Sequence, residues 1–199
     1  DIYIGIDFGL TPAAAFAQQT VTGKWVVFDE LTTEDMGATR FADLLNKKLS
    51  KDYPGHTFSI WGDPAGDGRA ETDENTPYRI LRSAGIEVQK PATNDQAIRF
   101  DAVRGVLKRM DMAAEPGFMI LPSVKMLRKS LKGGYCYKRI MVGGGDRFQD
   151  KPDKSSPYSH INDALQYLFL GAGEGKKVVA APKREQKALS RKHLHRAIV

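Results

Sequence analysis

The chain has 199 residues, which is enough for one well-cored domain, and its 41% hydrophobic and 27% charged residues are ordinary for a globular protein. A single cysteine, Cys136, excludes an internal disulfide framework and a cysteine-rich zinc site, and it suits a reducing cytoplasm. No apolar run approaches the ~20 residues of a membrane span and no signal peptide is recognisable, so no membrane partner is expected.

The net charge of +6 is unevenly distributed. Residues 176–199 hold eight Lys or Arg and one acid, a charge of +7, so residues 1–175 together carry −1. Residues 99–139 contain ten basic residues and three acids. A basic flank on a nearly neutral body suits a protein that holds cations in one place and phosphates in another. Solvated helix faces explain the same charge pattern equally well.

The N-terminal third predicts three strands and a helix. Residues 2–8 are rich in β-branched and apolar residues, and residues 13–20 and 25–31 return as two further strands. Because the connections are short, these strands must form an antiparallel meander. Residues 37–51 then predict a helix with one apolar face, formed by Phe41, Leu44, Leu45 and Leu49.

The middle of the chain alternates strands and helices. Residues 57–61 predict a fourth strand, a short helix runs from Pro77 to Gly85, and residues 86–88 predict a short fifth strand. Asn94 is expected to cap a longer helix, residues 118–121 are short and apolar, and Ser123 is expected to cap another short helix. The apolar face of the longer helix comprises Ile98, Ala102, Val103, Val106, Leu107 and Met110.

The last third predicts a hairpin and a final helix. Residues 133–150 alternate, are rich in glycine and aromatic residues, and favour a β-hairpin or flap. A helix begins at Ser156-Pro157, buries Ile161, Ala164, Leu165 and Leu168, and stops at Gly171 or Gly173. The predicted fold class is α/β: a five-stranded mixed sheet flanked by helices, in the ribonuclease H-like order. We expect one domain over residues 1–173 and a basic, flexible tail over residues 174–199.

Three aspartates stand at positions that favour a common site. Asp7 ends the first strand, and a carboxylate after a buried strand is costly unless it is paired or binds a cation. Asp63 ends the fourth strand, which the meander order places beside the first. Asp163 lies on the last helix, on the face it shares with His160 and Tyr167. A strand-end turn, an Asp-Pro turn and a surface helix residue are the plain alternatives, and Asp67 is a weaker substitute for Asp63.

Together the aspartates fit the hydrolysis of a phosphodiester bond by metal ions. Mg²⁺ and Mn²⁺ prefer carboxylate oxygens supplied from several elements, and two-metal sites hold the ions about 3.5–4 Å apart. No Cys/His cluster offers a zinc site in their place. We therefore expect Asp7, Asp63 and Asp163 to bind Mg²⁺ or Mn²⁺, with two ions as the favoured number.

Three segments resemble the C-terminal nuclease domain of the large terminase of tailed bacteriophages. They are the first strand with its Asp-Phe-Gly end, the turn Gly62-Asp63-Pro64-Ala65-Gly66, and the helix 158–168. Residues 127–137 and 152–154 extend the likeness, which spans roughly residues 1–173. The resemblance implies a metal-binding triad of Asp7, Asp63 and Asp163, in an endonuclease that cuts concatemeric double-stranded viral DNA when genome packaging starts and ends.

The resemblance also implies partners and a place of action. They are the portal protein, the small terminase subunit and an N-terminal ATPase domain, in the bacterial host cytoplasm and transiently at the procapsid portal, but not in the mature virion. The chain starts at Asp1 and has no phosphate-binding Gly-x-x-x-x-Gly-Lys-[Ser/Thr] loop, so we interpret it as a piece of a longer polypeptide without the motor half. The tail is expected to add salt-sensitive DNA affinity or to dock a packaging partner.

Lys154 and His160 are further candidate catalytic residues. Lys154 is suited to neutralise the scissile phosphate, or it is an ordinary loop lysine. His160 is suited to orient Asp163 or a water, or it packs against the sheet. The 133–150 flap carries Lys138, Arg139 and Arg147 and is placed to lie over DNA, and Tyr135 and Tyr137 either stack on DNA or cover the core.

Three other functions compete with this interpretation. Asp7-Phe8-Gly9-Leu10-Thr11 also resembles the first phosphate loop of actin-like and sugar-kinase ATPases, although those enzymes use two such lobes. Within the same fold, a Holliday-junction resolvase or a transposase-like enzyme is an alternative, separated by a preference for four-way junctions. A non-catalytic docking module for the portal or the small terminase subunit fits the basic tail.

Overall fold

In the computed structural model, the described residues are 1–67, 75–142 and 145–175, and the side chains of residues 142, 145 and 146 are left aside. The basic tail from residue 176 onward and the glycines at 143 and 144 therefore lie outside the description. Among the residues that are described, no helix is both long and apolar enough to cross a membrane.

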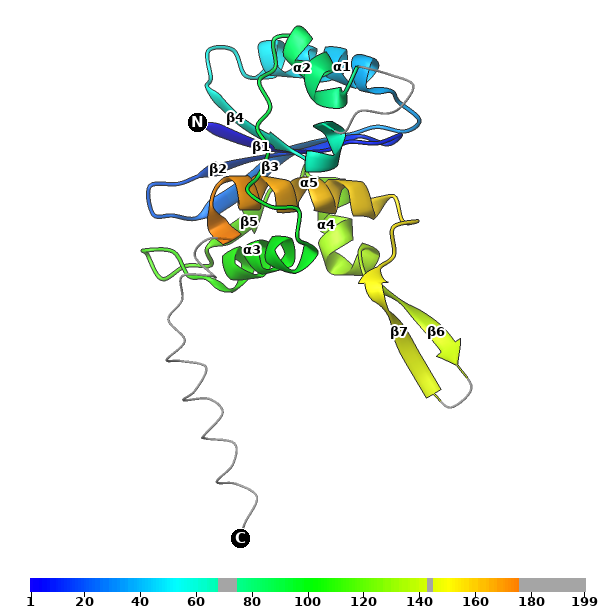
Figure 1. Cartoon of the computed structure of the whole chain (residues 1–199). Helices are drawn as coiled ribbons and strands as arrows, with labels where there is room; N and C mark the ends of the chain where they lie inside the picture. Colours follow the sequence, from blue (N-terminus) through cyan, green and yellow to red (C-terminus); the bar gives the residue numbers. More distant parts are fainter. Residues whose placement is uncertain (68–74, 143–144, 176–199) are drawn as a thin grey trace.

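A five-stranded mixed sheet forms the centre of the molecule, as predicted. Its order is β4-β1-β2-β3-β5 (Figure 1). The β1-β2 and β2-β3 pairs are antiparallel, which confirms the meander, while β4 runs parallel to β1 and β5 parallel to β3. The strands are β1 (Ile2–Asp7), β2 (Ala13–Gln19), β3 (Trp25–Thr32), β4 (Phe58–Gly62) and β5 (Phe118–Ile120).

Helices cover both faces of the sheet (Figure 1). α1 and α2 pack on one face, where Ile4, Phe16, Phe41 and Leu45 belong to one apolar cluster. α5 packs on the other face, with α3 and α4 on its outer side, around a second cluster that contains Trp25 and Phe169. The helices are α1 (Ala38–Asp52), α2 (Pro77–Ser83), α3 (Gln96–Lys108), α4 (Lys125–Lys129) and α5 (Tyr158–Gly171), with the short turns η1 (Pro64–Asp67) and η2 (Ser130–Gly134).

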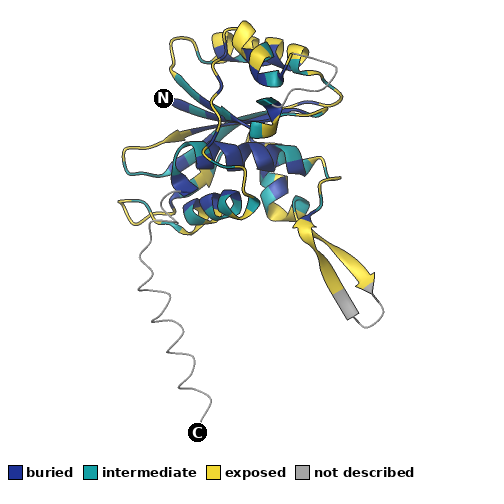
Figure 2. Cartoon of the chain, viewed as in Figure 1, coloured by how far each residue is buried: buried dark blue, intermediate teal, exposed yellow. Residues whose placement is uncertain are grey.

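The central helix α5 is buried on nearly all sides because it is enclosed by the sheet and by α3 and α4 (Figure 2). Its predicted apolar stripe of Ile161, Ala164, Leu165 and Leu168 is confirmed. The polar residues Asp163 and Gln166 are also buried, at 5% and 0% exposure. A helix covered all round needs partners for such polar groups, and these partners define the site described below.

The predicted fifth strand was misplaced. Residues 86–88 form no strand, and only Gln89 makes an isolated parallel bridge, to Trp61. The fifth strand is β5, in the segment that the sequence marked only as short and apolar. A run of three apolar residues does not distinguish a sheet edge from a buried connection, and pairing with β3 decides between them.

Two predicted helix starts were also wrong. Asp95, not Asn94, caps α3 by accepting a hydrogen bond from the Ile98 amide, at 3.1 Å. Val124 precedes α4 without a side-chain cap, while the Ser123 hydroxyl contacts the Phe28 carbonyl oxygen at 3.4 Å. Adjacent Asn and Asp compete for one cap position, and only the backbone path selects between them.

Some predicted core positions are exposed. Leu44 is 38% exposed, and Leu107 and Met110 are 45% and 57% exposed. α3 buries Arg99 together with Ala102, Val103 and Val106. A hydrophobic scale places arginine outside, so its burial is a tertiary effect with consequences for the site.

The predicted hairpin is present as β6 (Tyr137–Val142) and β7 (Gly145–Pro152), paired antiparallel. It projects from the body near the start of α5, and its described side chains are largely exposed (Figures 1 and 2).

Candidate metal and phosphodiester site

Asp7 faces the site because successive side chains of β1 point to opposite faces of the sheet. Ile2, Ile4 and Ile6 face the α1–α2 layer, so Tyr3, Gly5 and Asp7 face α5. The Asp7 carboxylate is 6% exposed, and its Oδ2 lies 2.8 Å from Nδ1 of His160 on α5. His160 therefore pairs with Asp7, a partner that was not among the roles the sequence left open, which were orienting Asp163 or a water and packing against the sheet.

Asp63 follows β4 at the same edge of the sheet. Ile6 of β1 pairs with Gly62 of β4 in parallel register, and the Asp63 amide donates to the Ile6 carbonyl oxygen at 3.0 Å. The two aspartates thus leave neighbouring parallel strands at their carboxyl ends. Oδ1 of Asp63 accepts hydrogen bonds from the Ala65 amide at 2.9 Å and from Nδ2 of Asn94 at 3.2 Å.

The position of Asp163 in the site depends on the close approach of α5 to β1. A Cβ on Gly5 would lie 1.9 Å from the Ala164 carbonyl oxygen, so only glycine lets the helix backbone lie against this strand. Asp163 is one residue from that contact. Its Oδ1 accepts from the Tyr135 hydroxyl at 3.2 Å and from Nε2 of Gln166 at 3.0 Å, and its Oδ2 pairs with the Lys154 ammonium.

All five predicted residues line one open pocket of about 540 Å³: Asp7, Asp63, Lys154, His160 and Asp163. Asp67 is not among its lining residues and pairs with Lys90 instead. The sequence placed β4 beside β1, but it offered no contact of either strand with α5, which lies far along the chain.

The three carboxylates of the pocket repel one another, although Arg99, Lys151 and Lys154 balance their formal charge. Burial raises the pKa of Asp7 from 3.8 to about 6, against the lowering effect of its hydrogen bond with His160. The charges of Asp163 and Asp63 raise this pKa further. The hydrogen bond to Asp7 in turn raises the pKa of His160, although burial of the imidazole opposes it. A cation placed among the carboxylates would relieve the same repulsion.

The donor set fits a hard divalent cation. Three carboxylates supply oxygen ligands of the kind Mg²⁺ and Mn²⁺ prefer, while Cys136 is exposed on the hairpin side. Within residues 1–67, 75–142 and 145–175, no group of three or more His, Cys, Asp or Glu stands arranged to hold a metal. The carboxylates of Asp7 and Asp163 are instead turned toward His160 and Lys154.

Five further residues that line the same pocket were missed by the sequence prediction: Asn94, Gln96, Arg99, Lys151 and Tyr167. Tyr167 was placed on the correct face of α5 but without a role. Arg99 gave a signal in its spacing, because it falls on the buried stripe of α3 with Ala102, Val103 and Val106. No signal in the sequence indicated the contact of Asn94 with Asp63, because that contact depends on the path of a loop.

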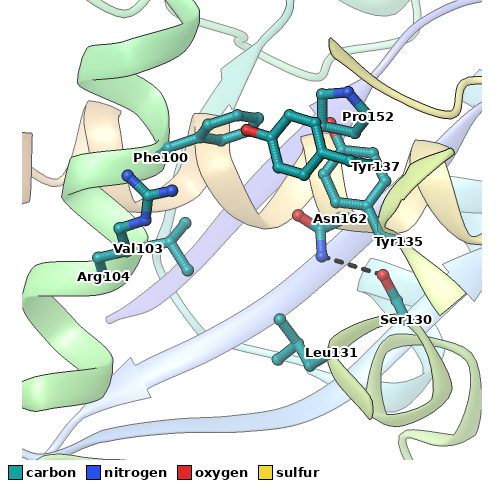
Figure 3. A pocket seen from close by; sticks show the side chains of 9 residues that line it. All are labelled: Phe100, Val103, Arg104, Ser130, Leu131, Tyr135, Tyr137, Pro152 and Asn162. Atoms are coloured by element: carbon teal, nitrogen blue, oxygen red, sulfur yellow. Dashed lines mark hydrogen bonds between the residues drawn. The ribbon is translucent and has the colours of Figure 1, made fainter. Parts of the chain in front are cut away.

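The base of the hairpin adjoins the site. A neighbouring pocket of about 190 Å³ lies between α3, the hairpin base and α5, lined by Phe100, Tyr135 and Tyr137 among others (Figure 3). Tyr135 packs edge-on against Phe100 and donates to Asp163, so it links the wall of this pocket to the site. Tyr137 is 40% exposed.

No family model matches the sequence, and no curated protein sequence is significantly similar to it. Two solved structures are similar in fold. The nuclease domain of the large terminase of bacteriophage SPP1, with bound manganese, superposes with a TM-score of 0.51 and 16% identity over 85% of each chain. The P22 large terminase nuclease domain gives 0.54 and 13% identity, over 86% of this chain and 80% of that one. At these identities the likeness establishes the fold: the chain has a ribonuclease H-like fold, shared with phage large terminase nuclease domains.

Proposed function

We propose that the chain is a metal-dependent endonuclease domain that hydrolyses phosphodiester bonds of double-stranded DNA. One observation carries the proposal: Asp7, Asp63 and Asp163 come from three separate elements and line one pocket, where Asp7 is buried among like charges. Burial of Asp7 and Asp163 beside a third carboxylate costs stability when no cation is bound, so a role in binding cations explains their placement.

The residues of the pocket have different roles in the proposed reaction. Asp7, Asp63 and Asp163 are the ligands for Mg²⁺ or Mn²⁺, favoured as two ions. Such ions, when bound, activate the attacking water and stabilise the leaving oxygen. His160 holds the Asp7 carboxylate through the 2.8 Å contact, and Tyr135 and Gln166 hold that of Asp163. Lys154, half exposed and close to Asp163, is placed to meet a phosphate oxygen.

DNA approaches the open side of the pocket in this proposal. Lys151 lines the pocket from the hairpin, and Lys138, Arg139 and Arg147 are exposed on the same hairpin. Such contacts reach phosphates and not base edges, so weak sequence preference is expected.

The biological role we propose is cutting concatemeric viral DNA at the start and end of genome packaging. It is supported by the terminase-like motifs around Asp63 and Asp163 and by the two similar phage structures, of which the SPP1 domain carries manganese. Portal protein, small terminase subunit and an ATPase domain are then the partners, in the host cytoplasm and at the procapsid portal.

The test is nicking of supercoiled plasmid by the full chain with Mn²⁺ or Mg²⁺. Asp7→Asn, Asp63→Asn and Asp163→Asn keep the side-chain shape but remove a ligand charge, so each is expected to lower the nicking rate by about 100-fold or more. Asp43→Asn, on the exposed face of α1, is the matched control and should cut normally. EDTA should abolish cutting.

Retained cutting by all three site variants would overturn the site assignment. ATP turnover without nicking would favour the actin-like ATPase lobe, and a strong preference for four-way junctions over linear duplex would favour a resolvase. Plasmid, ATP and a synthetic junction should therefore be tested with the same preparation.

A further inference from the structure

A chain of hydrogen bonds leads from buried Arg99 to Asp63. Nη1 of Arg99 donates to the Tyr167 hydroxyl at 2.5 Å, that hydroxyl contacts Oδ1 of Asn94 at 3.2 Å, and Nδ2 of Asn94 donates to Oδ1 of Asp63 at 3.2 Å. The three residues come from α3, α5 and the loop before α3. Arg99 and Tyr167 are buried, whereas Asn94 is exposed.

Arginine fixes the direction of every bond in this chain. A guanidinium only donates, so the Tyr167 oxygen must accept from it and direct its own proton to Asn94. Burial raises the pKa of Tyr167 far above its usual range, which keeps that proton in place. The Asn94 carbonyl oxygen is then occupied, and its amide nitrogen must face Asp63. Hydrogen bonds aligned in this way polarise one another.

The burial of Arg99 is unfavourable for the stability of the fold. The residue is 7% exposed, its Nε has no hydrogen-bond partner, and no carboxylate of the described residues lies within 4.0 Å of its guanidinium. Its guanidinium stacks over the Tyr167 ring at 4.8 Å from the ring centroid. A buried charge without an ionic partner destabilises a fold. The effect of Arg99 on the neighbouring site therefore explains its burial better than a contribution to stability does.

We propose that Arg99, Tyr167 and Asn94 form a positioning network that holds the Asp63 carboxylate ready for a divalent cation. The proposal rests on the metal-binding role of Asp63 in the proposed function. Oδ1 of Asp63 is held by Asn94 and by the Ala65 amide, while Oδ2 accepts no hydrogen bond from any described residue. The network thus fixes one oxygen and leaves the other available. Without it, Asn94 is an exposed loop amide that is free to rotate.

The decisive variant is Tyr167→Phe, which removes one hydroxyl and keeps the ring under Arg99. Loss of a partner behind a metal ligand typically costs 10- to 100-fold in metal affinity, so Mn²⁺ should bind about tenfold more weakly, measured by calorimetry on the full chain without DNA. Tyr53→Phe is the matched control, because the Tyr53 hydroxyl also donates to an aspartate, Asp29, but on the opposite side of the sheet. It should leave Mn²⁺ affinity unchanged.

Two further variants separate positioning from plain stability. Asn94→Ala should weaken Mn²⁺ binding as Tyr167→Phe does, and the double variant should be no weaker than either single one, because both break the same chain. Arg99→Met, which still covers the Tyr167 ring, should lower Mn²⁺ affinity while the melting temperature in EDTA stays level or rises.

Three outcomes overturn the network: equal Mn²⁺ affinity in Tyr167→Phe and Tyr53→Phe, additive losses in the double variant, or a lower melting temperature for Arg99→Met at unchanged affinity. If the wild-type chain neither binds Mn²⁺ nor cuts DNA, the proposed function fails and the network falls with it. If the wild type does both and Tyr167→Phe matches it, the network alone is wrong.

Discussion

Substitution of Gly5 by alanine tests how closely α5 must approach β1 to build the site. The added Cβ would meet the Ala164 carbonyl oxygen at 1.9 Å, the Leu168 amide nitrogen at 2.6 Å and the Leu168 Cβ at 2.8 Å. Real Cβ atoms essentially never lie closer than 3.0 Å to such atoms. Two of the three obstacles are backbone, so no side-chain rotation relieves the clash, and α5 must move away by about 1 Å.

This displacement should cost both stability and activity. Overpacking of a tight core costs typically 1–3 kcal/mol, and a rigid backbone contact places Gly5→Ala at about 3 kcal/mol. Asp163 moves with α5, while Asp7 stays on β1. A misplacement of about 1 Å at a catalytic site can lower the rate about 100-fold, so nicking should fall by about that factor at temperatures where the variant is still folded.

Urea unfolding and plasmid nicking measure the two effects on the same protein. Gly37→Ala is the control, since a Cβ there meets nothing within 4 Å and its backbone is extended. The control should lose at most about 1 kcal/mol, from weaker capping of α1, and keep its nicking rate. A Gly5→Ala variant as stable and as active as Gly37→Ala would refute the close-approach argument.

Two other variants test charges inside the body. Asp7→Asn in EDTA at pH 7.5 should be more stable than the wild type by up to about 3 kcal/mol, because the pKa of Asp7 is raised from 3.8 to about 6 in the folded state. The raised pKa makes the wild type lose stability as the pH rises from about 4 through 6, so the advantage should vanish when urea unfolding is repeated near pH 4; a variant less stable than wild type at pH 7.5 would contradict this. Glu174→Ala should cost about 3 kcal/mol in the same assay, because buried Glu174 accepts from Trp25 Nε1 and pairs with Arg109, both at 2.8 Å. An unfolding free energy within 0.5 kcal/mol or so of wild type would show that this pair is dispensable.

Glu174, which the sequence assigned to the tail, packs on the folded body. The sequence placed the boundary after residue 173, at the second of two glycines, because glycine commonly follows a helix. Glu174 and Gly175 are buried beyond that point, and Glu174 closes the hydrogen-bonded contact with Trp25 and Arg109. These contacts tie Glu174 to the body, and the boundary between the body and the tail stays a prediction.

The sequence by itself determined the meander and the last helix, and it predicted that three aspartates share a site, which the structure brings together in one pocket. Each rests on a local cause: short turns force antiparallel pairing, a 3.6-residue apolar period makes α5, and a carboxylate at a buried strand end is unfavourable without a partner. The strand order placed β4 beside β1, and the structure adds the parallel pairing that brings Asp7 and Asp63 to the same edge of the sheet.

Only the tertiary structure decided what each aspartate contacts. His160 was predicted on the correct helix face, but its partner is Asp7, because β1 lies under that face. Asp95 and not Asn94 caps α3, and the Asn94 side chain donates to Asp63. The packing of α3 on α5 buries Arg99 against Tyr167. The contacts of His160, Asn94 and Arg99 with their partners join residues 31 to 153 positions apart in the chain. Periodicity and propensity extend over a few turns of one element, so they cannot determine contacts that arise only when separate elements pack.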